Sequence, residues 1–334
     1  MGKYPVIDAH CDTVGLIARD HLGYDFRRRN RKGHIDLPRL KESGITLQFF
    51  ALYIEEEHKP VGSLKRCLQL LDHYYRTMES CRDKIDTVFN TADLDHLAKS
   101  DKLAVLLSIE GGEALENSIE VLHILFRLGI RALGLTWNQQ NQLATGVGKG
   151  SGGDGLTSFG RTVVREMNKL GMIVDLAHIN EKGFYEAIET SCRPVIVSHA
   201  NARSLCDHPR NLTDEQLKEL ARCGGVIGLS FYPAFITTGE TTLGDLLDHF
   251  VHIADLIGTD HLGFGSDFDG INKVIPGLED VTGLPRLIEG LQKRGFSREE
   301  IKKIAGINFL QILKKVLPPA KKEIAAPNKN RAEK

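Results

Sequence analysis

Residues 172–199 read MIVDLAHINEKGFYEAIETSCRPVIVSH, and two short runs of Val, Ile and Leu here flank a helical pattern. The apolar runs Met172–Ala177 and Pro194–Ser198 have the length and β-branched content of strands that are buried on both faces. Between them, Asn180–Glu189 places apolar residues at three- and four-residue intervals, as an amphipathic helix does. A strand, a helix and a second strand in this order predict a βαβ unit with parallel strands.

The same alternation continues along the chain in both directions. Six more apolar runs predict strands at Pro5–Ala9, Ile45–Leu52, Leu103–Ile109, Arg131–Thr136, Gly225–Ser230 and His261–Gly265. Helical patterns at 63–79, 118–128, 158–170, 213–222 and 242–257 lie between strands, and glycines follow several of them, where helix C-caps belong. Eight strands that alternate with helices predict an α/β fold of the (β/α)8 TIM barrel type, with an open doubly wound sheet as the alternative.

The chain of 334 residues is long enough for one such barrel with insertions, and we predict a single domain over residues 1–317. After the eighth strand, Leu284–Gln292 and a longer helical pattern that opens at Ser297 predict a C-terminal helical extension. Residues 318–334 are mostly Pro, Lys, Ala and Asn, a composition that predicts a flexible tail.

The composition argues against several classes of partner. With 43 Lys and Arg against 44 Asp and Glu, the chain has no basic excess to hold a polyanion, so we expect no nucleic-acid partner. No apolar run approaches the roughly 20 residues that a membrane-spanning helix needs, and no signal-peptide core is recognised, so we expect no membrane partner. Six cysteines without a CxxC pair are typical of reduced thiols and predict a cytoplasmic location.

Potential ligands follow five of the eight predicted strands, and in barrel enzymes the reacting groups lie at these carboxyl ends. In chain order they are His10 and Asp12, Glu110, His178, His199, and Asp267 with Asp269. Because the strand ends of a barrel meet at one mouth, we predict that three imidazoles and several carboxylates converge there.

These residue types predict a metal centre. His10 and Asp12 are two residues apart in an extended segment, so their side chains point to the same face and can hold one ion. Nitrogen and oxygen ligands without thiolates suit a catalytic zinc or a related divalent ion. Five ligands are too many for one tetrahedral ion with an open position, and we therefore predict two ions that share Glu110.

Other polar residues have plainer interpretations. Histidines elsewhere are expected to be surface or capped core residues, and Asp269 is expected to be a turn residue before Gly270. Cys11 points away from its neighbours in the strand, which favours a buried thiol over a nucleophile. Arg210 fits either a solvated loop charge or a functional group. The glycine-rich segment 146–153 lacks the GxxxxGK[ST] spacing of a phosphate-binding loop, and we expect a mobile active-site or surface loop there.

Together these motifs resemble one known family over nearly the whole chain. The motifs are Ile7–Asp12, Glu110–Gly112, Val174–His178, Val197–His199 and Gly263–Gly270, and Arg210-Asn211 also matches the family's spacing after His199. The sequence resembles the membrane dipeptidase (renal dipeptidase) family of zinc peptidases within the amidohydrolase superfamily.

The resemblance implies a role for each site residue. His10 and Asp12 would hold one zinc ion, His178 and His199 the other, and Glu110 would bridge them. Arg210 would bind the free carboxylate of a small dipeptide, and Asp267 would bind its free amino group and handle the proton. The implied function is a metal-dependent dipeptidase that hydrolyses free dipeptides through a water activated by two zinc ions. The family also implies a homodimer.

One departure concerns the end of the fourth predicted strand. Mammalian members of the family have a His after Leu-Thr, where this chain has Trp137, and either Asn138 or Asn141 could replace that His. An amidohydrolase of the same fold that acts on another amide, an N-acyl amino acid or a lactone is therefore an alternative. A binding or storage protein that keeps the metals without catalysis is a further one, for which Trp137 is the only support.

Overall fold

The computed structural model describes residues 4–19, 23–95, 97, 100–149 and 153–320. Nine strands are formed by these residues: β1 (Ile7–Asp8), β2 (Leu47–Tyr53), β3 (Ile85–Thr87), β4 (Leu103–Glu110), β5 (Ile130–Gly134), β6 (Ile173–Asp175), β7 (Ile196–Ala200), β8 (Val226–Leu229) and β9 (Leu262–Phe264). All eight predicted strands are present, and β3 is an additional one.

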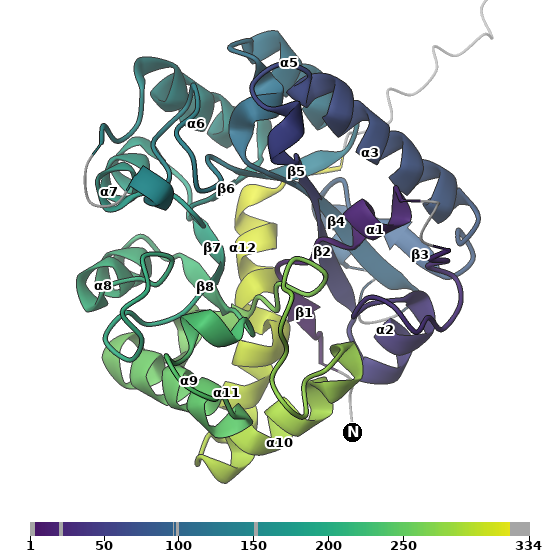
Figure 1. Cartoon of the computed structure of the whole chain (residues 1–334), viewed down its shortest axis with the longest axis vertical. Coiled ribbons are helices and arrows are strands. Elements are labelled where there is room, and N and C mark those ends of the chain that lie inside the picture. The colour runs from purple at the N-terminus through teal and green to yellow at the C-terminus, as the bar shows by residue number, and fades with distance from the viewer. Residues whose placement is uncertain (1–3, 20–22, 96, 98–99, 150–152, 321–334) are drawn as a thin grey trace, which may run out of the picture.

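The strands close into a parallel barrel (Figure 1). Each strand from β4 to β9 pairs with the next, β9 pairs with β1, β1 pairs with β2, and β2 pairs with β4 over its whole length. The short β3 pairs only with Leu103–Val105 at the start of β4 and lies outside this closed ring. The predicted TIM barrel is confirmed, and the open doubly wound sheet is wrong because β2 and β4 close the ring.

A buried carboxylate joins the strands where the two ends of the barrel sequence meet. Asp8 of β1 is fully buried and accepts hydrogen bonds from the Ser266 amide (2.8 Å) and the Ser266 hydroxyl (2.6 Å) after β9. The Gln48 amide of β2 donates a third hydrogen bond to it (2.8 Å). The Asp8 carboxylate therefore links β1 to β2 and to the residues after β9. We call this set of hydrogen bonds the closing seam.

Twelve α-helices are formed by the described residues, and the predicted ones among them begin and end within two residues of expectation. They are α1 (Thr13–Ile17), α2 (Leu37–Ser43), α3 (Ser63–Glu79), α4 (Thr91–Leu94), α5 (Ile119–Arg127), α6 (Ser158–Leu170), α7 (Glu181–Thr190), α8 (Asp214–Arg222), α9 (Leu243–Ile257), α10 (Leu284–Lys293), α11 (Arg298–Lys302) and α12 (Asn308–Val316). Caps explain the bounds of α6, where Thr157 accepts a hydrogen bond from the Gly160 amide and Gly171 adopts a left-handed conformation.

The C-terminal extension closes one end of the barrel. Phe309 and Leu313 of α12 share an apolar cluster with Leu47, Phe49 and other residues of the barrel strands, and α12 crosses behind the barrel in Figure 1. The sequence predicted one continuous helix here, but a π-helical segment at Lys303–Ile307 separates α11 from α12. The N-terminal strand packs against this segment, where a Cβ at Gly306 would lie 2.3 Å from the Pro5 carbonyl oxygen.

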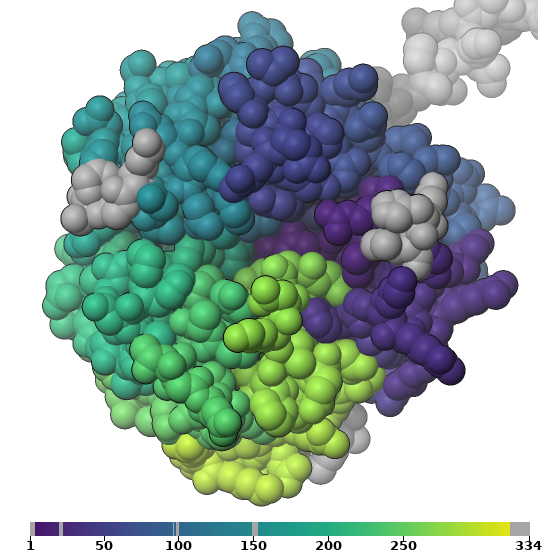
Figure 2. All heavy atoms as spheres, viewed as in Figure 1, coloured from purple at the N-terminus to yellow at the C-terminus, as the bar shows by residue number. Residues whose placement is uncertain are grey.

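Segments from opposite ends of the chain lie side by side around the barrel. Figure 2 shows the N-terminal segment, in purple, against the light green segment that follows β9. Backbone and side-chain hydrogen bonds join the two, including one from the Val281 amide to the His34 carbonyl and one from the Thr13 hydroxyl to Asp269. This contact brings the residues after β1 to those after β9.

Three further expectations concern the chain as a whole. All six cysteines are free. Among the helices of the described residues, none has the length and apolar character needed to cross a bilayer. Of the predicted tail, Pro318–Ala320 are described and residues 321–334 lie outside the described part, as do residues 150–152 of the glycine-rich segment.

Candidate metal centre

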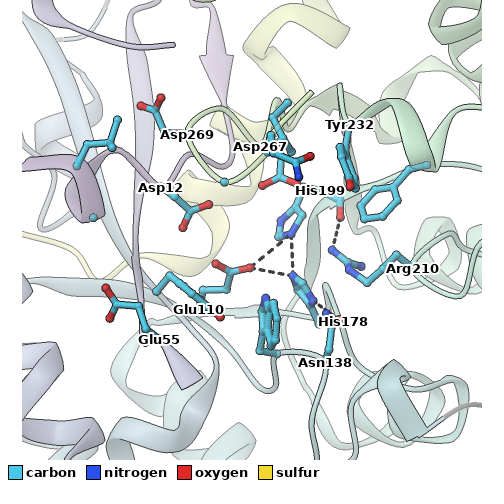
Figure 3. Close-up of a pocket in the computed structure, with 18 of the residues that line it drawn as sticks. Asp12, Glu55, Glu110, Asn138, His178, His199, Arg210, Tyr232, Asp267 and Asp269 are labelled. Carbon is cyan, nitrogen blue, oxygen red and sulfur yellow. Dashed lines mark hydrogen bonds and ion pairs between the residues drawn. The ribbon is translucent and has the colours of Figure 1, made fainter. Parts of the chain in front are cut away.

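All seven predicted site residues meet at the carboxyl ends of the barrel strands. A cavity of about 640 Å³ opens there, lined by Asp12, Glu110, His178, His199, Arg210 and Asp267 among others. His10 contacts four of these residues, which are Asp12, Glu110, His199 and Asp267. Figure 3 shows Glu110 reaching toward His178 and His199, with Arg210 on the far side of the two histidines from Glu55.

His10 and Asp12 lie in the segment after β1, which pairs with the segment after β9. Cys11 forms a parallel bridge with Phe268, and the Asp12 amide donates to the Phe268 carbonyl (2.9 Å). His10 and Asp12 point to the same side, with His10 Nε2 3.3 Å from Asp12 Oδ2. Cys11 points the other way, is fully buried and donates its thiol to the Phe49 carbonyl, which confirms the buried thiol.

Glu110, the last residue of β4, presents its two carboxylate oxygens to different histidines. Its Oε2 lies 3.6 Å from His10 Nε2. Its Oε1 lies 2.8 Å from His178 Nε2 and 3.6 Å from His199 Nε2. A carboxylate in this position can bridge two ions, one on each oxygen.

His178 and His199 point their Nε2 atoms toward one another, 2.9 Å apart. His178 follows β6 in a left-handed backbone conformation (φ 68°), which is uncommon outside glycine and turns its ring into the mouth. Its Nδ1 lies 2.8 Å from the Asn138 side-chain oxygen, which can only accept, so Nδ1 carries the proton and Nε2 offers a lone pair. The Ser198 hydroxyl forms a hydrogen bond with Nδ1 of His199 (2.9 Å).

The ligand atoms form two groups of three that share one residue. His10, Asp12 and Glu110 offer ligand atoms within 4.8 Å of one another, and so do Glu110, His178 and His199. The lone pair of His178 Nε2 faces a carboxylate oxygen at 2.8 Å, which is a contact between two acceptors unless a cation or proton lies with them. In addition, Asp12 Oδ1 is buried without a hydrogen-bond partner among the described residues. This donor set fits divalent cations.

Asp267 joins the cluster from the loop after β9. Its Oδ1 lies 3.8 Å from His10 Nε2, and with His10 and His199 it forms a third group of ligand distance. Asp267 also has a left-handed backbone (φ 65°), and its amide donates to the His10 carbonyl (3.3 Å). Gly270 packs against it, because a Cβ there would lie 2.6 Å from Asp267 Oδ1 and 2.2 Å from Asp12 Oδ2.

Burial dominates the electrostatics of the cluster. It raises the pKa of Glu110 to about 8, with a further increase from the nearby Asp12 carboxylate. Burial also raises the pKa of Asp12 and of Asp267. The pKa values of His178 and His199 are lowered well below the usual range, again mainly by burial, so both imidazoles are neutral. Neutral imidazoles are the form that binds metal ions, and a cation beside the carboxyl groups would displace their protons and leave them ionised.

Arg210 lies in the loop between β7 and α8 and points into the cavity. The residue is only 5% exposed, so the interpretation as a solvated loop charge is wrong. Its Nη2 donates to the His199 carbonyl (3.0 Å), and its guanidinium stacks on Phe235 at 5.3 Å from the ring centroid. Burial lowers the pKa of Arg210 to about 10, which still leaves a positive charge at neutral pH. Its Nε has no hydrogen-bond partner among the described residues.

The side chains of the two asparagines after the fourth predicted strand have different hydrogen-bond partners. The Asn141 side chain is used by the backbone, since it donates to the Leu135 carbonyl and accepts from the amides of Leu143 and Ala144. Asn138 lines the cavity next to Trp137 and orients His178. Of the two asparagines named from the sequence, only Asn138 can therefore act in the cavity.

Asp269 is a turn residue, as expected, with a left-handed backbone (φ 67°). Its carboxylate accepts from the Thr13 hydroxyl (2.7 Å) and the His34 amide (2.5 Å), which fixes the loop after β9 to the N-terminal segment.

Three further residues line the cavity and were not predicted from the sequence. They are Glu55, Tyr232 and Phe235. Tyr232 follows β8 closely, and its place after a strand end is the signal that could have identified it.

The chain is similar to known proteins over most of its length. A family model described as membrane dipeptidase (peptidase family M19) matches residues 1–326. Dipeptidase tcpJ of Claviceps purpurea is 35% identical over 328 residues, which cover 92% of this chain and 76% of that protein.

Solved structures with the same barrel are also similar. A metallopeptidase from Rhodobacter sphaeroides, with a phosphinate mimic of the dipeptide L-Ala-D-Ala bound, is 28% identical with a TM-score of 0.89; the match covers 94% of this chain and 99% of that one. An amidohydrolase from Pseudomonas aeruginosa is 25% identical with a TM-score of 0.81, over 95% of this chain and 97% of that one.

Proposed function

The chain belongs to the membrane dipeptidase family and is a metal-dependent dipeptidase, and from this premise we propose that it hydrolyses free dipeptides with two zinc ions bound at the barrel mouth. The observation that carries the proposal is the pair of ligand groups that share Glu110. His10 and Asp12 would hold one ion, His178 and His199 would hold the other, and Glu110 would be the ligand that both ions share. Imidazole and carboxylate ligands without thiolates favour zinc, although other divalent metals accept the same set.

When bound, the two ions would supply an activated water and polarise the substrate carbonyl. The remaining steps fall to side chains of this chain. Asp267 lies beside the ligand His10 and, with its raised pKa, is suited to take a proton and pass it to the leaving amine. It also offers a carboxylate to the free ammonium group of the substrate. Asn138 keeps His178 in the tautomer that binds metal.

Arg210 is proposed to bind the free carboxylate of the dipeptide. Its guanidinium is buried, charged and held by Phe235, and its Nε is free to donate among the described residues. A planar guanidinium matches a carboxylate with two parallel hydrogen bonds. Recognition of both termini, the ammonium by Asp267 and the carboxylate by Arg210, would limit substrates to dipeptides.

The proposal also covers the cellular location and the oligomeric state of the enzyme. The free cysteines support a reducing, cytoplasmic location. A homodimer is proposed by analogy with the family alone, and sedimentation of the purified protein would test it.

The proposal is tested by hydrolysis of a substrate panel with zinc-loaded protein, with and without a chelator. The panel contains L,L and L,D dipeptides, the latter because the Rhodobacter sphaeroides metallopeptidase holds an L-Ala-D-Ala mimic. It also contains a tripeptide, an N-acetylated dipeptide and an N-acyl amino acid. Cleavage confined to free dipeptides and lost with chelator is expected. Activity on the acylated compounds alone would instead favour the alternative amidohydrolase.

A further inference from the structure

Lys59 carries a buried ammonium group with aromatic rings as its neighbours. Its Nζ lies 5.0 Å from the ring centroids of both Tyr53 and Trp137. The side chain is 10% exposed, and within the described part of the chain Nζ has no hydrogen-bond partner. Burial of a charge without hydrogen bonds is unfavourable, so the surroundings of Lys59 must stabilise its ammonium group in another way.

An acidic residue completes the surroundings of Lys59. Glu113 Oε1 lies 3.9 Å from Nζ, and the Glu113 side chain is 6% exposed. Neither carboxylate oxygen has a hydrogen-bond partner among the residues described. The carboxylate folds back onto the chain at Gly111, where a Cβ would lie 2.3 Å from Oε2. Lys59 is thus held by one opposite charge and two π faces.

The two rings that contact Lys59 also line the metal cavity, and we call Tyr53 and Trp137 the aromatic wall. Tyr53 is the last residue of β2 and pairs in register with Glu110. The Trp137 ring lies 5.3 Å from the Tyr53 ring and 5.9 Å from the His178 ring. Lys59 is not itself among the residues that line the cavity. It therefore touches the wall and has no direct contact with the space that a substrate occupies.

We propose that Lys59, paired with Glu113, is a positioning residue that fixes the aromatic wall beside His178 and Glu110. A cation against the π faces of two rings holds both rings in one orientation, and Glu113 holds the cation. The inference rests on the proposed dipeptidase function only for its kinetic consequence.

Trp137 is the single tryptophan of the chain, so its fluorescence reports the wall directly. Lys59→Met keeps the length of the side chain and removes the charge, and it is expected to shift the emission maximum and to increase quenching by acrylamide. Lys59→Arg keeps a cation over the rings and is expected to retain the wild-type emission. Lys65→Met, at an exposed lysine of α3, is the control for loss of one positive charge.

The kinetic expectation follows from the position of the wall. Lys59→Met is expected to lower kcat for dipeptides about tenfold, because a loosened wall misplaces the substrate relative to the reacting groups. The KM value and the zinc content are expected to change little, since no residue that binds either terminus or a metal is altered. Lys59→Arg should restore kcat to within a few-fold of the wild-type value.

A Lys59→Met protein with wild-type kcat and wild-type emission would overturn the inference. Lower stability to heat without a change in either readout is the pattern that a purely structural lysine gives. If Lys59→Met does not fold, Tyr53→Leu removes one face of the wall instead, and the same change in Trp137 emission is expected. A wild-type protein without dipeptidase activity would overturn the proposed function, while the fluorescence comparison would still test the wall.

Discussion

Gly270 lies between two carboxylates of the site, with no room for a side chain. Because a Cβ there would meet both Asp12 Oδ2 and Asp267 Oδ1 far inside contact distance, Gly270→Ala must displace at least one of them. We expect kcat/KM for dipeptides to fall tenfold or more, about the effect of a small misplacement of reacting groups, together with a loss of bound metal. Hydrolysis rates and metal content per chain, measured on the same preparation, check this.

Gly15 provides a matched control for this substitution. It lines the same cavity from α1, but a Cβ there would have no heavy atom within 4 Å. Gly15→Ala should keep the activity and could gain about 0.5–1 kcal/mol of stability from the helix preference of alanine. If the two variants behaved alike, the contacts of Gly270 would not explain its effect.

Arg210 is the residue on which the choice between free dipeptides and other amides depends. Arg210→Met removes a charge-assisted hydrogen-bond donor, typically worth about 1.5–3 kcal/mol, and should raise KM for dipeptides roughly 10- to 100-fold. The rate on a C-terminally amidated dipeptide should change much less, because that compound has no carboxylate to bind. Steady-state kinetics on the two substrates is the measurement.

The control for Arg210 is Arg222→Gln on α8, whose side chain is largely exposed and pairs with Glu219 on the same helix. It should leave both substrates unaffected. An unchanged KM for dipeptides in Arg210→Met would reject the proposed carboxylate contact and favour the amidohydrolase alternative.

At the scale of the elements, one histidine of α9 ties together two loops of the site. His249 is 1% exposed; its Nδ1 accepts from the Ala202 amide (3.1 Å) in the loop that carries Arg210, and its Nε2 donates to the Ile236 carbonyl (3.0 Å) beside Phe235. His249→Phe leaves two buried backbone groups without partners. We expect a loss of about 2–5 kcal/mol in the free energy of unfolding and a higher KM, as Arg210 loses its support.

Urea unfolding and steady-state kinetics on the same variant measure both effects of His249→Phe. His123→Phe on α5 serves for comparison, because that imidazole is 37% exposed and contacts only Glu166 (3.1 Å). Its stability should stay within about 0.5 kcal/mol of the wild type. Equal KM values in wild type and His249→Phe would show that Arg210 is held without His249.

The elements that the sequence predicted well are those with a long or strongly apolar pattern. All eight barrel strands and helices such as α6 were predicted within a few residues, because burial on both faces and caps leave clear signals. The short elements α1, α2, α4 and β3 were not predicted. They have three to seven residues, too few for a period to be recognised, and β3 depends on its pairing with β4.

The site residues also divide into those that the sequence predicted and those that it did not. Its candidate ligands follow strand ends, and a barrel brings strand ends together whatever the distance along the chain. Lys59, Glu113 and Tyr53 gave no signal, because their contact depends on which strands are neighbours and on how the loops pack. The bridging position of His249 was missed for the same reason. The roles of the predicted ligands themselves remain predictions until metal is measured.

At the scale of the whole molecule, the candidate ligands come from four strands spread around the barrel, so bound metal should stabilise the folded chain as a unit. An ion that binds only the folded state at a free concentration of 100 times its Kd adds about 2.7 kcal/mol to the stability. Thermal unfolding of zinc-loaded protein should therefore occur several degrees higher than that of chelator-treated protein. Equal unfolding temperatures would mean that the cluster does not bind zinc tightly when folded.

The closing seam has a consequence for how the chain is made. Asp8 leaves the ribosome 258 residues before Ser266, which supplies two of its three hydrogen bonds. At 5–20 residues per second, synthesis of that interval takes roughly 10–50 seconds. Throughout that time β1 has no β9 to pair with, and one edge of the growing sheet stays open. The newly made chain is therefore most exposed to wrong pairing, and most in need of a chaperone, in the seconds before β9 emerges.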